Sequence, residues 1–217
     1  TTECPVAARF ASAALTRIFS ARPAKDCASA RVKPIVMLMD TPDETLAAAA
    51  AARDRDAFAA LLARHYDRIF GLAFRLTGSR AEAEDLTQDV CLALPDKLAS
   101  YRQQARFTTW LYRVTVNAAH DRRRRTATQV RAGDGWGDWE LARQAELAEA
   151  AEARDWLDAA MGQLAPELRD TVALTLGEDL SQAEAAEVLG VSEGTVAWRM
   201  SEVKKRLRAL ARAEGML

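Results

Sequence analysis

The chain of 217 residues has few of the side chains from which several kinds of functional site are built. It has three cysteines, Cys4, Cys27 and Cys91, which are odd in number and far apart, so neither a disulfide framework nor a zinc site is expected. Two histidines, His65 and His120, are too few for a multi-histidine metal centre. The sequence therefore predicts no metal and no cofactor.

Long apolar runs and strand patterns are missing as well. No uncharged apolar run reaches the roughly 18 residues that a membrane-spanning helix needs. The alternation of polar and apolar residues typical of strands is absent. There is no glycine-rich phosphate loop, no paired metal motif, and no Cys/His pair placed for nucleophilic chemistry. We therefore expect an all-α protein that does not insert into a membrane, is not an enzyme and has no small-molecule substrate.

The chain also lacks an excess of charge of one sign, with 30 Lys and Arg against 31 Asp and Glu. Taken alone, this balance argues against a protein that binds nucleic acid. It is, however, a cancellation between segments. Residues 53–130 carry 14 basic and 9 acidic side chains, residues 131–168 carry 3 and 9, and residues 169–217 carry 7 and 8. A basic, an acidic and a mixed block in series predict two modules joined by an acidic connector.

The first residues have a different character. Residues 1–36 carry six basic and two acidic side chains and show no sustained helical period. An organellar transit peptide, a disordered tail, and an extension ahead of a natural start at Met37 or Met39 are all compatible with this composition. We favour the last, and expect residues 1–38 to be a disordered or non-native N-terminal extension.

Most of the remaining chain repeats its apolar residues at steps of three and four, which predicts amphipathic helices. A long helix is expected to end at Gly78 in a left-handed cap, and the next begins at Ser79. That second helix should be interrupted by Pro95, because proline lacks the backbone N–H and clashes with the preceding turn. A third helix is expected over about residues 107–125.

The sharpest local pattern lies in residues 180–210. Ser181 opens a short capped helix, Gly190 suits a left-handed turn, and Ser192 can cap a second helix. The outer side of this second helix presents Thr195, Trp198, Arg199, Glu202, Lys205 and Arg206. Short polar and arginine side chains near a helix N-terminus can reach base edges in the major groove, and later lysines and arginines can hold phosphates. The pattern predicts a DNA-binding helix-turn-helix.

Two groups of motifs resemble one family. SQAEAAEVLGVSEGTVAWRMSEVKKRLRAL resembles the module that reads the promoter −35 element in bacterial RNA polymerase sigma factors of the extracytoplasmic-function (ECF) group, within the sigma-70 family. AEDLTQDV and RFTTWLYRVTVNAAHDRRRR resemble that group's other module, which binds the polymerase and opens the −10 element. The resemblance covers about residues 54–212 in the family's order. It implies two small helical domains, residues 39–126 and 154–217, joined by a flexible acidic linker over residues 127–153.

The resemblance also implies a function and a set of contact residues. The protein would be a cytoplasmic bacterial factor that binds core RNA polymerase, recognises the −35 and −10 elements, and is held by an anti-sigma factor. The polymerase-binding residues would be Asp85, Leu86, Gln88 and Asp89. The −10 DNA-binding residues would be Tyr101, Arg106, Arg113, Asn117, His120, Arg122, Arg123 and Arg124, with a flipped base held by the loop over residues 100–106. The −35 DNA-binding residues would be Ser192, Thr195, Trp198, Arg199, Lys205 and Arg206.

The sequence departs from the family pattern in two helices. Pro95 lies where the polymerase-binding helix usually continues. In the recognition helix, Ala197 and Trp198 stand where residues are usually basic or small, and Glu202 stands where a basic residue is common. The carboxylate of Glu202 must face a base, pair with Lys205 or Arg206, or weaken the binding of DNA phosphates. The alternative function is a stand-alone helix-turn-helix regulator that dimerises through residues 54–125 and binds DNA without polymerase. The AEDLTQDV and RFTTWLYR motifs argue against it.

Overall fold

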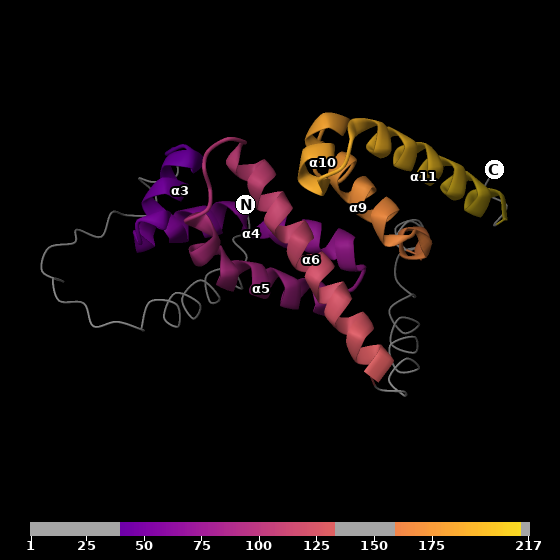
Figure 1. Cartoon of the computed structure of the whole chain (residues 1–217), viewed down its shortest axis with the longest axis horizontal. Helices are drawn as coiled ribbons and strands as arrows, with labels where there is room; N and C mark the ends of the chain where they lie inside the picture. Colours follow the sequence, from indigo (N-terminus) through magenta and orange to yellow (C-terminus); the bar gives the residue numbers. More distant parts are fainter. Residues whose placement is uncertain (1–39, 133–158, 214–217) are drawn as a thin grey trace, which may run out of the picture.

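The computed structural model describes residues 40–132 and 159–213, and all regular elements in these ranges are α-helices (Figure 1). The predicted all-α class is confirmed. The predicted N-terminal extension lies outside the described residues, as does the predicted acidic linker from residue 133 to its expected end. The expected domain boundary at residue 126 falls inside a helix, which continues to Ala132.

The helices form two units. The N-terminal unit, residues 40–132, contains α3 (Asp43–Ala51), α4 (Arg55–Thr77), α5 (Arg80–Leu98) and α6 (Phe107–Ala132). The C-terminal unit, residues 159–213, contains α9 (Pro166–Thr175), α10 (Gln182–Leu189) and α11 (Glu193–Ala213). In the N-terminal unit α4 is central, because α3, α5 and α6 all pack against it.

Local capping explains where several helices begin and end. Gly78 ends α4 with φ 74°, a left-handed conformation that costs glycine little. The side chain of Ser79 then accepts the backbone N–H of Glu82 at the start of α5. Ser181 and Glu184 form a complete capping box at α10, and Gly190 ends that helix with φ 66°. The helix termini predicted at these residues are confirmed.

The interruption predicted at Pro95 is wrong. Helix α5 continues through the proline to Leu98. A proline inside a helix removes one hydrogen bond and crowds the previous turn. Here Leu94 and Leu98, which lie on either side of it, are both buried in the core. Packing of these two leucines offsets the lost hydrogen bond, so tertiary contacts hold the last turn of the helix.

The two units share one hydrophobic core. Helix α9 packs against α4, and α10 packs against α6. Ala173, Leu174 and Val188 of the C-terminal unit belong to the same buried cluster as Leu72 and Leu111 of the N-terminal unit. The sequence predicts two modules, and the tertiary structure adds that they are docked.

A buried histidine joins α3 to α4. Nε2 of His65 lies 2.9 Å from Oδ2 of Asp43, whose carboxylate also pairs with Arg64. The other ring nitrogen of His65, Nδ1, is buried and has no hydrogen-bond partner among the residues that the structure describes. Burial lowers the pKa of His65 below its ordinary 6.5, and the charge of Asp43 offsets only part of this effect.

The lowered pKa of His65 predicts a loss of stability in mild acid. The unfolded chain, with the ordinary pKa of 6.5, binds the proton more readily than the folded chain. The contribution of neutral His65 to the free energy of unfolding is therefore complete above pH 6.5 and is lost as the pH falls below it. The slope of this loss is at most about 1.4 kcal/mol per pH unit. Urea unfolding between about pH 7.5 and 5.5 measures the effect. In His65→Gln the free energy of unfolding should depend less on pH. An equal pH dependence in the wild type and the variant would refute this prediction.

Candidate nucleic-acid interface

Three polar residues predicted to bind polymerase lie on one exposed side of α5. Asp85, Gln88 and Asp89 are all exposed, and their spacing of three and four residues places them on adjacent turns. Leu86, which the resemblance includes in the same set, is completely buried. It supports α5 from inside the core and offers no surface to a partner.

The same acidic residues contact a residue predicted to bind DNA. The guanidinium of Arg122 on α6 donates to Oδ2 of Asp85 at 2.8 Å and to Oδ2 of Asp89 at 3.3 Å. The two carboxylates remain 62% and 59% exposed, so these ion pairs add little to stability. Arg122 therefore lies on the α5 side of α6, beside the predicted polymerase surface.

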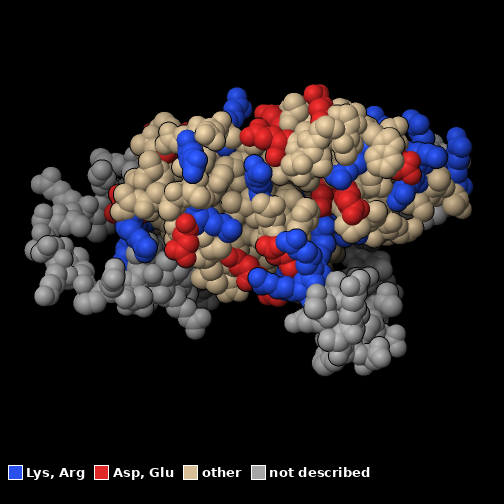
Figure 2. All heavy atoms as spheres, in the orientation of Figure 1, with Lys and Arg blue, Asp and Glu red and all other residues tan. Residues whose placement is uncertain are grey.

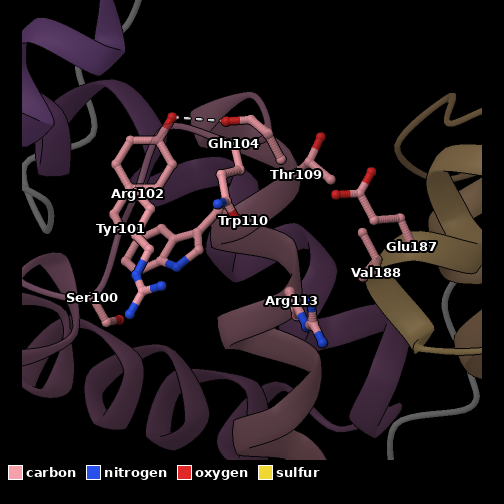
Figure 3. A pocket seen from close by; sticks show the side chains of 10 residues that line it. Ser100, Tyr101, Arg102, Gln104, Thr109, Trp110, Arg113, Glu187 and Val188 are labelled. Carbon is pink, nitrogen blue, oxygen red and sulfur yellow. Dashed lines mark hydrogen bonds between the residues drawn. The ribbon is translucent and has the colours of Figure 1, made fainter.

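A pocket lies where the loop over residues 99–106 meets the start of α6 (Figure 3). Its volume is about 150 Å³, and its walls include Tyr101, Trp110 and Arg113. The pocket therefore lies between α6 and the loop that is expected to hold a flipped base. The wall opposite the loop comes from the C-terminal unit, where Glu187 and Val188 of α10 line the same pocket.

Aromatic contacts hold this loop in place. The ring of Tyr101 lies 5.2 Å from that of Trp110 and 5.6 Å from that of Phe107, measured between centroids. Its hydroxyl donates to the carbonyl of Ala105 at 2.9 Å. Burial, with the nearby charge of Glu44, raises the pKa of Tyr101, so the phenol stays protonated at neutral pH. Tyr101 therefore both shapes the loop and contributes an aromatic wall to the pocket.

Some of the residues predicted to bind the −10 DNA are exposed, and others pair with acidic side chains. Arg106, Arg113 and Asn117 are exposed. The guanidinium of Arg124 pairs with Asp121, its neighbour on the same helix. The other two residues of the predicted −10 set are His120 and Arg123, and both contact the C-terminal unit.

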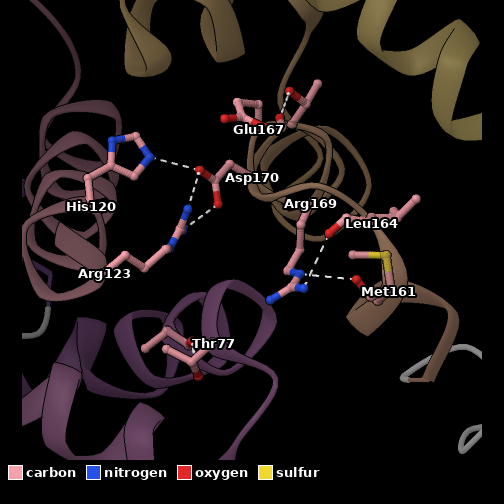
Figure 4. Close-up of polar contacts among 10 residues, drawn as sticks. Thr77, His120, Arg123, Met161, Leu164, Glu167, Arg169 and Asp170 are labelled. Carbon is pink, nitrogen blue, oxygen red and sulfur yellow. Dashed lines mark hydrogen bonds and ion pairs between the residues drawn. The ribbon is translucent and has the colours of Figure 1, made fainter. Parts of the chain in front are cut away.

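His120 and Arg123 converge on one buried carboxylate (Figure 4). Nε2 of His120 lies 2.8 Å from Oδ2 of Asp170, and the guanidinium of Arg123 donates to both carboxylate oxygens at 2.6 and 3.2 Å. The Asp170 side chain is only 2% exposed. Burial alone would raise the pKa of Asp170, but the hydrogen bonds from His120 and Arg123 bring it below the ordinary value. The carboxylate is therefore ionised at neutral pH.

The predicted recognition helix is α11. Ser192 caps it by accepting the backbone N–H of Thr195 at 3.2 Å, and the two hydroxyls are hydrogen-bonded at 2.8 Å. Trp198 is 64% exposed, which is unusual for so large an apolar ring. Figure 2 shows Lys and Arg gathered over α11. Glu202 forms an ion pair with Arg206 at 3.0 Å, which is one of the three arrangements expected for this carboxylate.

The remaining residues of the predicted −35 surface lie on the same helix. Lys205 and Arg206 are exposed, and Arg199 is half-buried. Val196 and Val203, on the inner side of α11, are buried, as the predicted apolar stripe requires. The helix therefore presents one basic, solvent-facing side.

Sequence reasoning missed that Asp170 pairs with the basic helix α6, that Glu178 pairs with Arg75 of α4, and that Glu187 lines the pocket. Each is an acidic residue in a short helix or turn, and nothing in its neighbourhood along the chain distinguishes it from a solvated side chain. The only available signal was the acidic character of the segment after Pro166, which does not say which residues it faces.

Two kinds of feature are not found in the described ranges, residues 40–132 and 159–213. No helix there is long and apolar enough to cross a bilayer. No three His, Cys, Asp or Glu side chains there are grouped in a way that could hold a metal ion.

Comparisons with known proteins match both units in order. Residues 61–129 match the family model "Sigma-70 region 2", and residues 154–207 match "Sigma-70, region 4". The ECF RNA polymerase sigma factor SigM of Mycobacterium tuberculosis is 36% identical over 171 residues, which cover 77% of this chain and 84% of SigM. The ECF RNA polymerase sigma factor SigW of Bacillus subtilis is 28% identical over 166 residues, covering 71% of this chain and 89% of SigW.

Solved structures are similar as well. CnrH, in complex with the cytosolic domain of CnrY, superposes with a TM-score of 0.57 at 31% identity, covering 79% of this chain and 97% of that one. The sigma factor RpoE of Bartonella quintana shares the fold, with a TM-score of 0.59 at 21% identity over 70% of this chain and 94% of that one.

Proposed function

We propose specific roles for three surfaces of this chain, which belongs to the extracytoplasmic-function group of RNA polymerase sigma factors. As a member of that group it directs promoter-specific transcription initiation. Sigma factors are initiation factors rather than catalytic enzymes. The matches to both sigma-70 regions, in their usual order, disfavour a stand-alone helix-turn-helix regulator.

The polymerase surface is the exposed side of α5. Asp85, Gln88 and Asp89 supply two carboxylates and an amide that point away from the core. Complementary charge on a partner would steer association and fix its orientation. Pairing with Arg122 keeps the two carboxylates close together in the free chain. The site covers about one and a half turns of one rigid helix.

The −10 surface is the pocket of the loop over residues 99–106 together with the adjacent side of α6. A cavity of about 150 Å³ is the size at which an engineered apolar cavity in another protein takes up benzene, so a single base ring is a fitting occupant. Tyr101 and Trp110 supply aromatic walls for stacking, and Arg113 lies at the edge to bind a phosphate or base. This combination of an aromatic pocket with an adjacent cationic helix carries the proposal.

The −35 surface is the outer side of α11. Thr195, Trp198 and Arg199 lie in its first turns, where a recognition helix contacts base edges. Lys205 and Arg206 lie further along and would bind phosphates, which position the helix without reading sequence. Because Glu202 pairs with Arg206, its negative charge is partly neutralised where the DNA backbone would lie.

We also propose a regulatory partner protein and a location. The structure of CnrH contains the cytosolic domain of CnrY, so a similar factor is able to form a complex with a second protein. An anti-sigma factor is the partner that fits a chain of this family. Because a sigma factor works on RNA polymerase, the place of action is the bacterial cytoplasm.

Run-off transcription with core polymerase on genomic DNA tests the function. Polymerase with the full chain should initiate at a limited set of start points that share a −35 and a −10 sequence, whereas core polymerase alone should not. Absence of start points that depend on this chain would refute the proposed function.

Trp198→Ala should weaken initiation at those promoters about tenfold, since one direct contact in the major groove is worth roughly 1–3 kcal/mol. The variant should remain as stable as the wild type, because the ring is 64% exposed. Leu176→Ala, which removes another exposed apolar side chain of the C-terminal unit, is the matched control. A promoter with a scrambled −35 element should not distinguish Trp198→Ala from wild type, and equal losses on both promoters would argue against −35 contact.

A further inference from the structure

Helix α3 belongs to none of the three proposed binding surfaces, yet it lies beside the loop that leads into α6 (Figure 1). It precedes the match to sigma-70 region 2, which begins at residue 61. In the fold it packs against α4, α5 and α6. Leu46, Ala47 and Ala50 bury one side of the helix in the core. The first turn of α3 is therefore held in a fixed position next to this loop.

Glu44, in the first turn of α3, supplies an acceptor that the residue before α6 cannot provide. The first backbone N–H groups of a helix have no partner inside it and are usually satisfied by a side-chain oxygen of the preceding residue. Here that residue is Arg106, whose carbonyl accepts the N–H of Trp110 but whose guanidinium has only donors. Oε1 of Glu44 instead accepts the backbone N–H of Phe107 at 3.4 Å, from 63 positions away along the chain. Its negative charge also suits the positive end of the helix dipole.

The backbone of Glu44 contacts the middle of the same loop. Its carbonyl oxygen accepts a hydrogen bond from the side-chain amide of Gln103 at 3.5 Å. Gln103 has φ 56°, in the left-handed region, which residues other than glycine rarely adopt and which persists where the surroundings hold it. Its neighbours Arg102 and Gln104 both line the pocket. The turn at Gln103 therefore sets how the two flanking side chains meet the pocket.

A second set of contacts runs from α3 to the aromatic walls of the pocket. Asp43 pairs with His65 of α4, and the ring of His65 lies 5.3 Å from that of Phe107 between centroids. The Phe107 ring in turn lies 5.6 Å from the rings of Tyr101 and Trp110. His65 and Phe107 are each only 3% exposed, so this packing is buried. Phe107 is the point where both sets of contacts meet, because α3 holds its backbone N–H and His65 packs on its ring.

From these contacts we propose that Glu44 is a positioning residue for the −10 pocket. It caps α6 and holds the turn of the loop, and thereby sets the shape of the pocket. It does so without touching the strand, because it is not among the residues that line the pocket. This inference rests on the proposed role of the pocket in holding a −10 base. It gives α3, which lies outside the predicted binding surfaces, a part in promoter recognition.

The size of the effect follows from the contacts that are lost. Without the cap and the contact at Gln103, the loop has more conformations, of which only a fraction can bind the base. Loss of an N-cap side chain corresponds to about a fivefold change in an equilibrium constant. Glu44→Ala should therefore weaken binding of the −10 base by about this factor. Glu44→Gln keeps an acceptor oxygen and should stay closer to the wild type.

The test uses holoenzyme reconstituted with the full chain and a template that is duplex at −35 and single-stranded at −10, with the sequence found by run-off. An abasic site is placed at each −10 position in turn. The position where it weakens the wild type most is the one whose base enters the pocket. Glu44→Ala should bind the intact template about fivefold more weakly than the wild type in fluorescence anisotropy. The two proteins should bind the template with that abasic site equally, because it does not use the pocket.

Two further variants accompany Glu44→Ala. Thr45→Ala is the matched control, because Thr45 is the next residue of α3 and is exposed. It should bind both templates as the wild type does. Gln103→Gly removes the other hydrogen bond while allowing a positive φ, so it should weaken binding of the intact template by a smaller factor. Circular dichroism checks that each variant is folded.

A double-mutant cycle tests the cap itself. Arg106→Ser places a hydroxyl acceptor directly before α6, where serine is a preferred cap. In the free chain, Glu44→Ala should lower the free energy of unfolding less in the Arg106→Ser background than in the wild type, because the serine replaces the lost acceptor. Equal losses in the two backgrounds would show that Glu44 does not cap α6, and would overturn the proposal.

Equal binding of the intact template by Glu44→Ala and Thr45→Ala would also overturn the positioning role. So would an equal loss by Glu44→Ala on the intact and abasic templates, because that result indicates a general loss of folding or of polymerase binding. A wild-type holoenzyme that responds to no abasic site would contradict the proposed role of the pocket, and this inference with it. Run-off transcription that depends on the chain would still support the initiation function in that case.

Discussion

Replacing Asp85 and Asp89 together with asparagine is expected to weaken binding of core RNA polymerase by about 100-fold and to abolish initiation at limiting factor concentration. Both carboxylates are exposed on one side of α5, so the change leaves the core of the N-terminal unit intact. A loss of about 1.4 kcal/mol for each of the two charges, or about 2.7 kcal/mol in total, corresponds to about 100-fold. Titration of labelled chain with core polymerase measures the loss.

Two variants control this experiment. Asp67→Asn removes an exposed charge from α4, away from the proposed polymerase surface, and should bind normally. Arg122→Gln removes the cation that contacts both carboxylates in the free chain, so it should not weaken polymerase binding. If the double variant bound as tightly as Asp67→Asn, the polymerase surface would have to lie elsewhere.

Leu72→Ala is expected to lower the free energy of unfolding by about 2–5 kcal/mol, because it removes three heavy atoms from a packed core and leaves a cavity. Leu72 is completely buried on α4, the helix against which α3, α5, α6 and α9 all pack. Since domains of this size are stable by only about 5–15 kcal/mol, such a loss is large. Urea unfolding followed by circular dichroism measures it.

Leu92→Ala is the companion variant. The Leu92 side chain on α5 is 42% exposed, and surface substitutions usually change stability by less than about 0.5 kcal/mol. Similar small effects of the two variants would show that α4 is not the centre of the fold.

Much of the local structure could be predicted because its causes lie close together in the chain. Gly78 and Gly190 end their helices through their own backbone freedom, and Ser181 caps α10 through a residue three positions away. The helix-turn-helix follows from such signals in residues 180–210. The family followed from two sets of motifs in the expected order, and the comparisons confirmed it.

Predictions were less successful where a residue's partner comes from a distant part of the chain. Pro95 should end α5 by the local rule, yet burial of Leu94 and Leu98 carries the helix past it. The resemblance includes Leu86 in the polymerase-binding set, yet it is buried, as are Ala83, Thr87 and Val90 of the same motif. Packing decides which residues of a motif stay exposed, and the motif by itself does not specify that.

The sequence by itself determined that this protein is all-α, that it contains the two sigma-factor modules, and which helix faces are basic. These properties follow from the local periodicity, the capping and the motifs. Only the tertiary structure decided that the modules dock, and that Asp170 lies between His120 and Arg123. The reason is physical: the contact joins residues about 50 positions apart, and its free energy depends on burial and geometry that arise only when both units are folded and packed together.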